Sequence, residues 1–258
     1  MMEWRKVTVG YGESPVLRRL DLTLPAGCLV SLIGPNGCGK TTLLKTAARL
    51  LPVGEGTVYL DGRDTSTFGR RELARRVALL PQTRDIPDMT VETLALHGRF
   101  PYLGWNRQPR AEDREMAQQA MIEAGVWEYR SRNLRSLSGG ERQKAYLAMT
   151  IAQNADWLLL DEPTTYLDIR HQFDILHLIE NLQRRGKSIV MVLHDLPQAL
   201  QVSQQVVLMQ AGQVRISGTP DEVVQSGLLQ EVFGAHPHRL ERTNGPLYYF
   251  TPLEEGDD

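Results

Sequence analysis

The chain has 258 residues, of which 41% are hydrophobic and 23% are charged, and its formal net charge at pH 7 is −2. This composition excludes an intrinsically disordered chain and allows a sizeable core that needs no disulfide bonds. The near-neutral charge balance gives no bulk attraction to nucleic acid or to anionic lipid, so we expect no nucleic-acid partner.

The cysteines and the apolar runs indicate the cellular compartment of the protein. Its two cysteines, Cys28 and Cys38, match neither a metal-ligand spacing nor a disulfide framework, which fits a reducing compartment. The apolar runs are short, and none approaches the roughly 20 residues that cross a bilayer. The N-terminal residues Glu3, Arg5 and Lys6 precede no apolar stretch of the kind found in a secretory signal. We therefore expect a cytosolic chain that does not itself span a membrane.

The first third of the chain alternates strand and helix patterns. Apolar residues run continuously over 28–33 and end at a glycine, and the following apolar positions, from Leu43 to Leu51, recur at helical spacing. The expected elements are a β-rich layer over 8–24, a strand over 28–33, a helix over 40–51, a strand over 57–60, a basic helix over 70–76 with a solvated face, and a strand over 77–80.

The middle of the chain changes to helical patterns, with proline and glycine clusters between the helices, and strands return after it. The later strands are continuous apolar runs, which a sheet covered on both faces requires, so we expect a largely parallel sheet. The expected elements are helices over 91–100, 111–124 and 141–152, strands over 157–160 and 188–193, a helix over 221–225 capped by Thr219, Pro220 and Glu222, and a frayed acidic tail over 254–258.

A phosphate-binding loop lies between the strand over 28–33 and the helix after it. Its sequence fits the pattern GxxxxGK[ST], and its residues are Gly34, Pro35, Asn36, Gly37, Cys38, Gly39, Lys40, Thr41 and Thr42. In such a loop the backbone N–H groups surround phosphate oxygens, Lys40 reaches the β and γ phosphates, and Thr41 holds Mg²⁺. The alternative is a glycine-rich turn with a chance lysine, but the flanking strand and helix favour an ATP site.

Polar residues follow three of the expected strands. Asp161 and Glu162 come directly after the strand over 157–160, His194 follows the strand over 188–193, and Gln82 follows the strand over 77–80. The carboxyl edge of a parallel sheet is where ligands bind, so Asp161 can reach Mg²⁺ and Glu162 can orient the attacking water. Taken singly, each residue has a structural alternative: a helix cap, a hydrogen-bonding histidine or a surface glutamine.

A second anion site is predicted where the segment Leu137-Ser138-Gly139-Gly140-Glu141-Arg142-Gln143 begins a helix. A protein with one nucleotide pocket needs a second such site only if that site serves another copy of the chain. With this segment, the chain resembles an ATP-binding subunit of an ABC transporter. The resemblance covers nearly the whole chain and depends on elements in the family's order: Tyr11, the phosphate loop, Gln82, the LSGGE signature, Asp161-Glu162, Leu167-Asp168 and His194.

The resemblance implies a role for each of these elements. Tyr11 would stack on adenine, and Asp168 would lie in a loop that crosses the interface of a dimer. The residues expected to meet the γ phosphate held by the other copy are Ser138, Gly139, Gly140 and Glu141. The expected catalytic residues are Glu162, His194, Gln82 and Lys40, and the expected Mg²⁺ ligands are Thr41, Gln82 and Asp161. ATP and Mg²⁺ are the expected cofactors, and a monomer is expected to be nearly inactive.

The resemblance also implies an α/β fold, that of a P-loop NTPase of the ABC ATPase type. Such a fold has a RecA-like core, an antiparallel β layer and a helical subdomain. We expect the core with its β layer over 1–86 and 155–235, the helical signature subdomain over 87–154, and a C-terminal extension over 236–258. Cys38 departs from the serine or alanine usual in this loop; a thiol there could be sensitive to alkylation, or it could be a tolerated small side chain.

The cargo is suggested by lineage alone. The stretches 98–102 and 163–172 resemble ATPases of importers for ferric siderophores, haem and vitamin B12, with ferric siderophores, including ferric citrate, as the closest likeness. The expected partners are a second copy, polytopic permease subunits and a substrate-binding protein, with the chain at the cytoplasmic face of the inner (plasma) membrane. The segment 88–105 is expected to form the groove for a permease helix, with Phe100, Tyr102 and Trp105 either exposed there or buried.

Two other interpretations stay open. A soluble ABC ATPase that acts on ribosomes or DNA is disfavoured by the single cassette and by the lack of a heptad run. An exporter cassette is disfavoured because the sequence contains no membrane segment. His236 and His238 surround one proline without nearby acidic or cysteine ligands, so we expect loop residues rather than a metal site.

Overall fold

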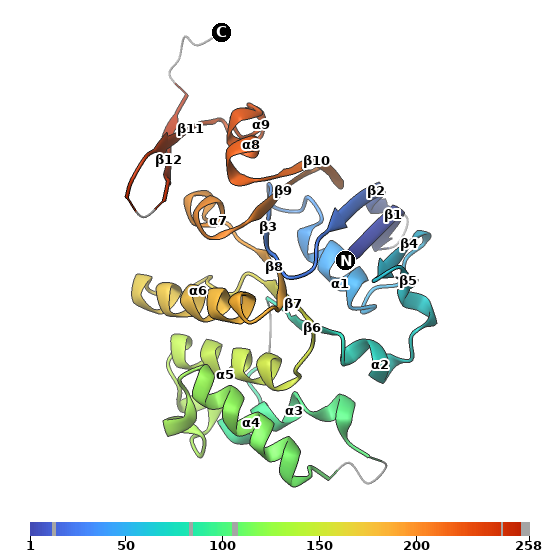
Figure 1. Ribbon diagram of the computed structural model, residues 1–258, viewed down its shortest axis with the longest axis vertical. Helices are drawn as coiled ribbons and strands as arrows, with labels where there is room; N and C mark the ends of the chain where they lie inside the picture. Colours follow the sequence, from blue (N-terminus) through green and yellow to red (C-terminus); the bar gives the residue numbers. More distant parts are fainter. Residues whose placement is uncertain (12–13, 83–84, 105–107, 244, 254–258) are drawn as a thin grey trace. The chain divides into compact units, whose positions relative to one another are not determined.

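The computed structural model describes residues 1–11, 14–82, 85–104, 108–243 and 245–253. The described chain forms two compact units, one of residues 1–66 and 190–258 and the other of residues 67–189. Figure 1 follows the chain through the first unit (blue), the second (cyan to yellow) and back to the first (orange and red). Trp105 and the predicted acidic tail over 254–258 lie outside the described residues.

The first unit begins with an antiparallel sheet, which confirms the predicted early β-rich layer. Its strand order is β2-β1-β4-β5. The Trp4 indole is buried and donates to Thr46 Oγ1 at 2.9 Å, which joins this sheet to the helix that follows the phosphate loop. The strands are β1 (Met2–Tyr11), β2 (Ser14–Leu24), β4 (Glu55–Leu60) and β5 (Arg63–Asp64).

The same unit contains the strand that leads into the phosphate loop. Every residue of β3 (Leu29–Ile33) is buried, and β3 pairs in parallel with β9 (Gln205–Gln210), to which β10 (Gln213–Gly218) pairs antiparallel. The order in this unit is β10-β9-β3-β8, where β8 (Ser188–Val192) is divided between the two units at residue 190. Burial on both faces explains why these strands read as continuous apolar runs.

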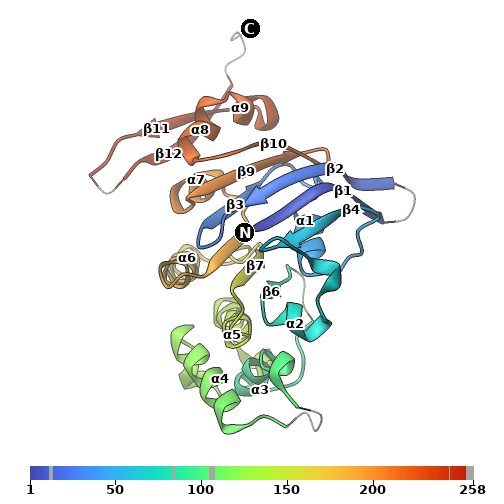
Figure 2. The same ribbon diagram turned by 45° about the vertical axis from the view of Figure 1, so that its right-hand side comes forward.

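Helices and a hairpin complete the first unit, and Figure 2 shows the hairpin beside α8 and α9. Its helices are α1 (Lys40–Ala47), α7 (Leu196–Val202), α8 (Pro220–Gln225) and α9 (Leu228–Phe233), and the hairpin is β11 (Ala235–Leu240) with β12 (Leu247–Pro252). The predicted cap of α8 is confirmed, because Thr219 Oγ1 accepts from Glu222 N and Glu222 Oε2 accepts from Thr219 N.

Two predictions about this unit are wrong in detail. The helix predicted over 40–51 ends at Ala47, because Arg49 takes a left-handed φ of 52° and its guanidinium donates to Thr65 O. His236 and His238 lie in strand β11 rather than in a loop. Pro237 is tolerated between them because β11 pairs on one side only, with β12.

The second unit joins a parallel pair of strands to a group of helices. In this unit β6 pairs in parallel with β7, and the strand order is β8-β7-β6. Figure 1 shows α3, α4 and α5 lying together. The elements are α2 (Arg70–Ala74), β6 (Val77–Leu80), α3 (Val91–His97), α4 (Ala111–Glu123), α5 (Gly139–Ala152), β7 (Trp157–Asp161) and α6 (Ile169–Arg184), with short 3-10 turns at Phe100–Tyr102, Trp127–Tyr129 and Leu134–Ser136. The 3-10 turn Thr65–Thr67 is divided between the two units at residue 67.

A buried ion pair ties the helices of this unit together. Arg99 Nε lies 3.1 Å from Asp113 Oδ1, and Arg99 Nη1 donates to Ala152 O at 2.9 Å, so one guanidinium reaches both α4 and the end of α5. The helix predicted over 91–100 ends at His97, and Pro101 belongs to the 3-10 turn that follows. No helix among the described residues combines the length and the apolar character that a bilayer span requires.

Candidate functional site

The phosphate loop of the first unit is shaped by three glycines. Gly34, Gly37 and Gly39 have φ values of +147°, +77° and +109°, which L side chains rarely adopt. A Cβ on Gly34 would lie 2.1 Å from Met209 O, and one on Gly39 would lie 2.6 Å from Leu17 Cδ2. A Cβ on Gly37 would meet nothing within 4 Å. Gly34 therefore needs glycine for space because it faces backbone, Gly39 faces the end of a side chain that can shift, and Gly37 needs glycine only for conformation.

Lys40 is the first residue of α1, and its side chain folds back into the loop. Its ammonium donates to Gly34 O at 2.7 Å and to Pro35 O at 2.9 Å, and Lys40 is only 6% exposed. A charged donor group is thus held inside a glycine loop at the amino end of a helix, where the helix dipole also favours an anion. This geometry matches the predicted phosphate site.

Cys38 lies within the same loop. Its sulfur is 3.8 Å from Lys40 Nζ, and its own N–H donates to Pro35 O. Burial raises the pKa of the Cys38 thiol, although the Lys40 charge acts in the opposite direction. A buried, protonated thiol is a poor nucleophile, so the structure favours the tolerated small side chain over the alkylation-sensitive residue.

Two further predicted residues of the first unit lie at the ends of strands. Tyr11 is the last residue of β1 and is 57% exposed, so much of the residue is open to solvent. His194 is exposed between β8 and α7, and the neighbouring Asp195 caps α7 by accepting from Gln198 N at 2.8 Å. Asp195 is therefore the N-cap of α7.

In the second unit, Asp161 and Glu162 stand at the carboxyl end of β7. Asp161 is the last residue of the strand and is 2% exposed. Glu162 has a left-handed φ of 53°, and its Oε2 accepts from Thr165 Oγ1 at 3.0 Å. A non-glycine residue in this conformation costs about 1–3 kcal/mol, and such strain is concentrated at functional sites.

The signature segment begins α5 with a capping box. Ser138 Oγ accepts from Glu141 N at 3.3 Å, and Glu141 Oε2 accepts from Ser138 N at 2.8 Å. The Ser138 N–H is the main cause of a lowered pKa of Glu141. Gly139 is exposed, whereas Gly140 is buried against His171. The helix start is therefore capped by its own side chains and presents Gly139 to solvent.

Three of the predicted residues line one cleft of the second unit, with a volume of about 470 Å³. Gln82, Gly139 and Glu162 bring the ends of β6 and β7 together with the start of α5. Arg142 and Tyr146 also line it, and the sequence analysis assigned them no role. They follow Gly139 by three and seven residues, which places them on the same face of α5. This helical spacing could have predicted that they lie beside Gly139.

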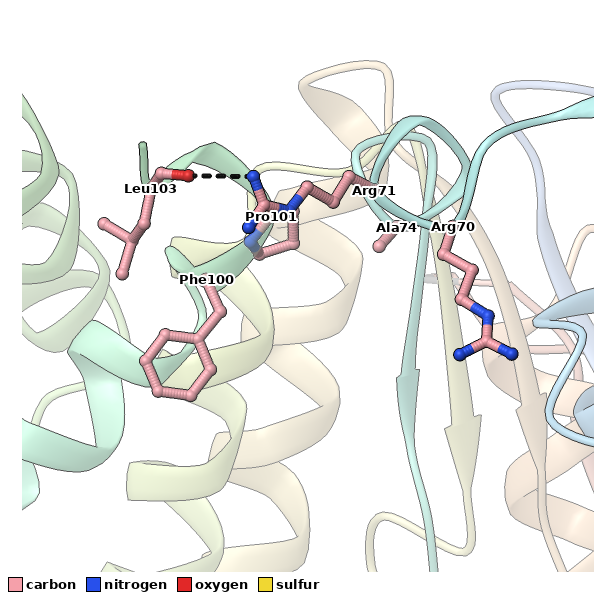
Figure 3. Close-up of a pocket in the computed structure, with 6 residues that line it drawn as sticks. All are labelled: Arg70, Arg71, Ala74, Phe100, Pro101 and Leu103. Carbon is pink, nitrogen blue, oxygen red and sulfur yellow. Dashed lines mark hydrogen bonds between the residues drawn. The ribbon is translucent and has the colours of Figure 1, made fainter. Parts of the chain in front are cut away.

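A second pocket of the same unit involves the predicted permease groove, and Figure 3 shows its residues. The pocket measures about 320 Å³, and Arg71 Nη1 closes one side by donating to Leu103 O at 3.2 Å. Phe100 lines it and is 53% exposed, so of the two alternatives for this ring the structure shows exposure. Tyr102 is half-buried beneath the Arg99 guanidinium, 3.8 Å from the ring centroid. The basic segment is solvated only in part: Arg70, Arg71 and Arg75 are exposed, but Arg71, Arg75 and Arg76 donate to Leu103 O, Pro101 O and Asp156.

Comparison with known proteins gives the same assignment as these features. The family described as ABC transporter matches residues 17–165. The chain is 42% identical over 234 residues to the petrobactin import ATP-binding protein FpuD of Bacillus anthracis, covering 90% of this chain and 86% of that protein. It is 40% identical over 231 residues to the ferric enterobactin transport ATP-binding protein FepC of Escherichia coli K12, covering 89% and 85% of the two chains.

A solved structure extends the likeness to three dimensions. The ATP-binding cassette MJ0796, in a dimeric post-hydrolysis state bound to ADP and Pi, aligns with a TM-score of 0.75 and 27% identity, covering 85% of this chain and 99% of that one. The predicted family and fold class are confirmed. This chain belongs to the ABC transporter family and is one of its ATP-binding, ATP-hydrolysing cassettes.

Proposed function

We propose that this chain energises the import of a ferric siderophore or a related ferric chelate through partner membrane subunits. The support for the cargo comes from relatives of about 40% identity, which match nearly the whole chain and are named for petrobactin and ferric enterobactin. The observation that carries the chemistry is the Lys40 ammonium held by the carbonyls of Gly34 and Pro35 inside the phosphate loop.

In this proposal residues 34–42 bind the phosphates of ATP and Tyr11 stacks on its adenine. The Lys40 ammonium exchanges its bonds to the loop carbonyls for bonds to the β and γ phosphates. Because both sets of acceptors are oxygens, this exchange keeps the buried cation satisfied. The positive end of α1 then faces the phosphate charge.

The hydrolytic step assigned to this site is attack of water on the γ phosphorus. The bond between that phosphorus and the oxygen bridging it to the β phosphate breaks, and ADP leaves with the bonding electron pair. Glu162 orients the water and accepts its proton, and Gln82 and His194 help to position the water and the γ phosphate. Phosphoryl transfer depends mainly on positioning and charge stabilisation, which suits a carboxylate held at a strained turn.

The predicted Mg²⁺ ligands are oxygen donors of the kind that this cation prefers. Thr41 supplies a hydroxyl in the first turn of α1, Asp161 supplies a nearly buried carboxylate at the end of β7, and Gln82 supplies an amide oxygen after β6. Bound Mg²⁺ would neutralise charge on the phosphates. The donor set therefore fits the ion that the proposal requires.

The signature is the segment that we assign to contact with a second copy of the chain. We propose that Ser138, Gly139, Gly140 and Glu141 meet the γ phosphate held by the partner, and that Asp168 lies at the same interface. Support comes from the capping box and the exposed Gly139, together with the dimeric state of the cassette described above.

The remaining partners are membrane subunits and a substrate-binding protein. We propose that a permease helix docks in the pocket lined by Phe100, Pro101 and Leu103, whose exposed aromatic ring is typical of interfaces. Such docking would place the chain on the cytoplasmic face of the inner (plasma) membrane as a peripheral subunit. The predicted division into a core over 1–86 and 155–235, a helical subdomain over 87–154 and an extension over 236–258 is part of the same proposal.

The test is uptake of radiolabelled iron by cells that carry this chain together with a permease of a ferric siderophore importer. Iron supplied as a ferric siderophore should accumulate with the native chain and not with the Glu162→Gln variant. Accumulation of haem or vitamin B12 alone would replace the proposed cargo with another of the same transporter class. Co-purification with ribosomes or DNA, and not with a polytopic membrane protein, would overturn the transport function itself.

A further inference from the structure

An imidazole occupies the space beside the signature glycine Gly140. A Cβ built on Gly140 would lie 2.3 Å from Cδ2, 2.5 Å from Cγ and 2.7 Å from Nε2 of His171. His171 belongs to the first turn of α6, and its side chain is 29% exposed. The ring therefore packs directly on the backbone of the signature segment.

The opposite edge of the same ring is held by Asp168. His171 Nδ1 lies 2.7 Å from Asp168 Oδ2, and His171 N donates to Asp168 Oδ1 at 2.9 Å. The pKa of Asp168 is lowered, first by the backbone bond from His171 and then by the side-chain bond. With an ionised carboxylate as acceptor, Nδ1 carries the proton and donates. Asp168 thus fixes the ring orientation, and the ring cannot turn away from Gly140 without breaking this bond.

Other contacts join the same two segments at a greater distance from the signature glycines. Gln143 Nε2 donates to Pro163 O at 2.7 Å, and Lys144 Nζ lies 2.6 Å from Asp174 Oδ2. The first turns of α5 are therefore tied to the loop and helix that follow Glu162. His171 is the side chain of this group that touches a signature glycine and an interface carboxylate together.

We propose that His171 is a positioning residue that holds the signature glycines and Asp168 as one surface for the partner copy. This inference rests on the proposed role of the signature in the dimer. His171 contacts protein groups on both sides of its ring, so it acts through Gly140 and Asp168 rather than on ATP itself. Loss of the ring should leave nucleotide binding to the phosphate loop unchanged and should weaken the closed dimer.

The test uses three substitutions in the full-length Glu162→Gln chain, which is expected to accumulate an ATP-bound dimer. His171→Ala removes both contacts, His171→Asn retains a donor for Asp168, and His171→Phe retains a ring beside Gly140. Sedimentation would measure the ATP concentration that gives half-maximal dimer, and a fluorescent ATP analogue would measure binding to the monomer.

His171→Ala should raise the half-maximal ATP concentration about tenfold, as expected when residues in contact are uncoupled. The Asn and Phe variants should fall between Ala and the parent, and all variants should bind the fluorescent analogue like the parent. Dimer formation by all three variants within about twofold of the parent would overturn the inference. If the Ala variant does not fold, the comparison of Asn and Phe with the parent decides the result.

A reciprocal substitution tests the packing contact itself. Gly140→Ala should strongly weaken dimer formation when His171 is present, because the new methyl group meets the His171 ring. The same substitution should weaken dimer formation less in the His171→Ala background, where the space is open. Strictly additive effects on dimer formation would show that the two residues do not act together.

The outcome for the parent separates this inference from the proposed function. A Glu162→Gln parent that binds ATP but never dimerises would overturn the trans role of the signature, and the inference with it. A parent that dimerises normally while the His171 variants match it would overturn the positioning role alone.

Discussion

The phosphate loop and the signature both lie at the start of a helix, but the two helix starts differ in how they are capped. Helix α1 is preceded by Gly39, which has no side chain to cap it, and the Lys40 ammonium is buried within the loop. Helix α5 is capped by its own residues Ser138 and Glu141 and presents Gly139 to solvent. The start of α1 therefore leaves its backbone N–H groups without a side-chain cap, whereas the start of α5 is capped by its own side chains; we propose that the first binds an anion within the chain and that the second meets a ligand held by the partner copy.

The largest expected effect is a loss of ATP hydrolysis in a variant that leaves both helix starts unchanged. Glu162→Gln should lower ATP turnover by about a thousandfold, because the amide can still accept from Thr165 but can no longer take the proton of the attacking water. A steady-state phosphate-release assay measures this, with Glu180→Gln, a carboxylate of α6 that pairs with Arg184, as the matched control. Turnover of Glu162→Gln within tenfold of the native rate would remove Glu162 from its role.

A second comparison tests how the phosphate loop encloses its ligand. Gly34→Ala should abolish ATP binding or folding, because the new methyl group meets the carbonyl oxygen of Met209. Gly37→Ala should lower the free energy of unfolding by only about 1–2 kcal/mol, the cost of an alanine in a left-handed conformation, since no atom lies within 4 Å of its methyl group. Thermal unfolding and nucleotide titration of the two variants give the contrast. Equal effects of the two substitutions would contradict the packing role of Gly34.

A smaller effect separates the cap of the signature from nucleotide binding. Ser138→Ala should destabilise the start of α5 by about 1 kcal/mol, as loss of a serine cap usually does. Turnover should fall, whereas binding of a fluorescent ATP analogue to the monomer should not change. Weaker binding to the monomer would indicate that the signature serves the loop of its own chain.

The smallest expected effect is the pH dependence of the same cap. The pKa of Glu141 is lowered in the folded chain. Its contribution to stability is therefore complete above the unfolded pKa, near the ordinary glutamate value of 4.5, and is lost as the pH falls through the folded pKa. Glu141→Gln should remove this part of the acid dependence of thermal unfolding. Identical acid profiles for the native chain and the variant would contradict it.

Local patterns predicted the phosphate loop and its flanking elements because each part depends on neighbours in sequence. The continuous apolar run over 28–33, the glycines and Lys40 lie within a short stretch, and β3 and α1 form around them as expected. Helix ends were predicted less well. The turn at Arg49 is stabilised by Thr65, sixteen residues away, and such a contact leaves no local signal.

The parts of the site that were missed depend on packing between distant segments. Helix α6 was not among the predicted elements, although Ile175, Ile179 and Leu182 follow helical spacing. Without α6, the contact of His171 with Gly140 could not be predicted, because it joins residues 31 positions apart. Arg142 was seen in the signature, but its position in the cleft with Gln82 and Glu162 follows from tertiary structure.

The central claim is that the signature of one copy completes the phosphate loop of the other, and mixing two inactive variants tests it most directly. Lys40→Ala disables the loop, and Ser138→Arg places a bulky side chain on the signature. If the sites are shared between copies, a mixed dimer has one intact site, and an equal mixture should recover up to about a quarter of native turnover. If each chain uses its own signature, no intact site exists in any dimer, and a mixture as inactive as its components would contradict the account.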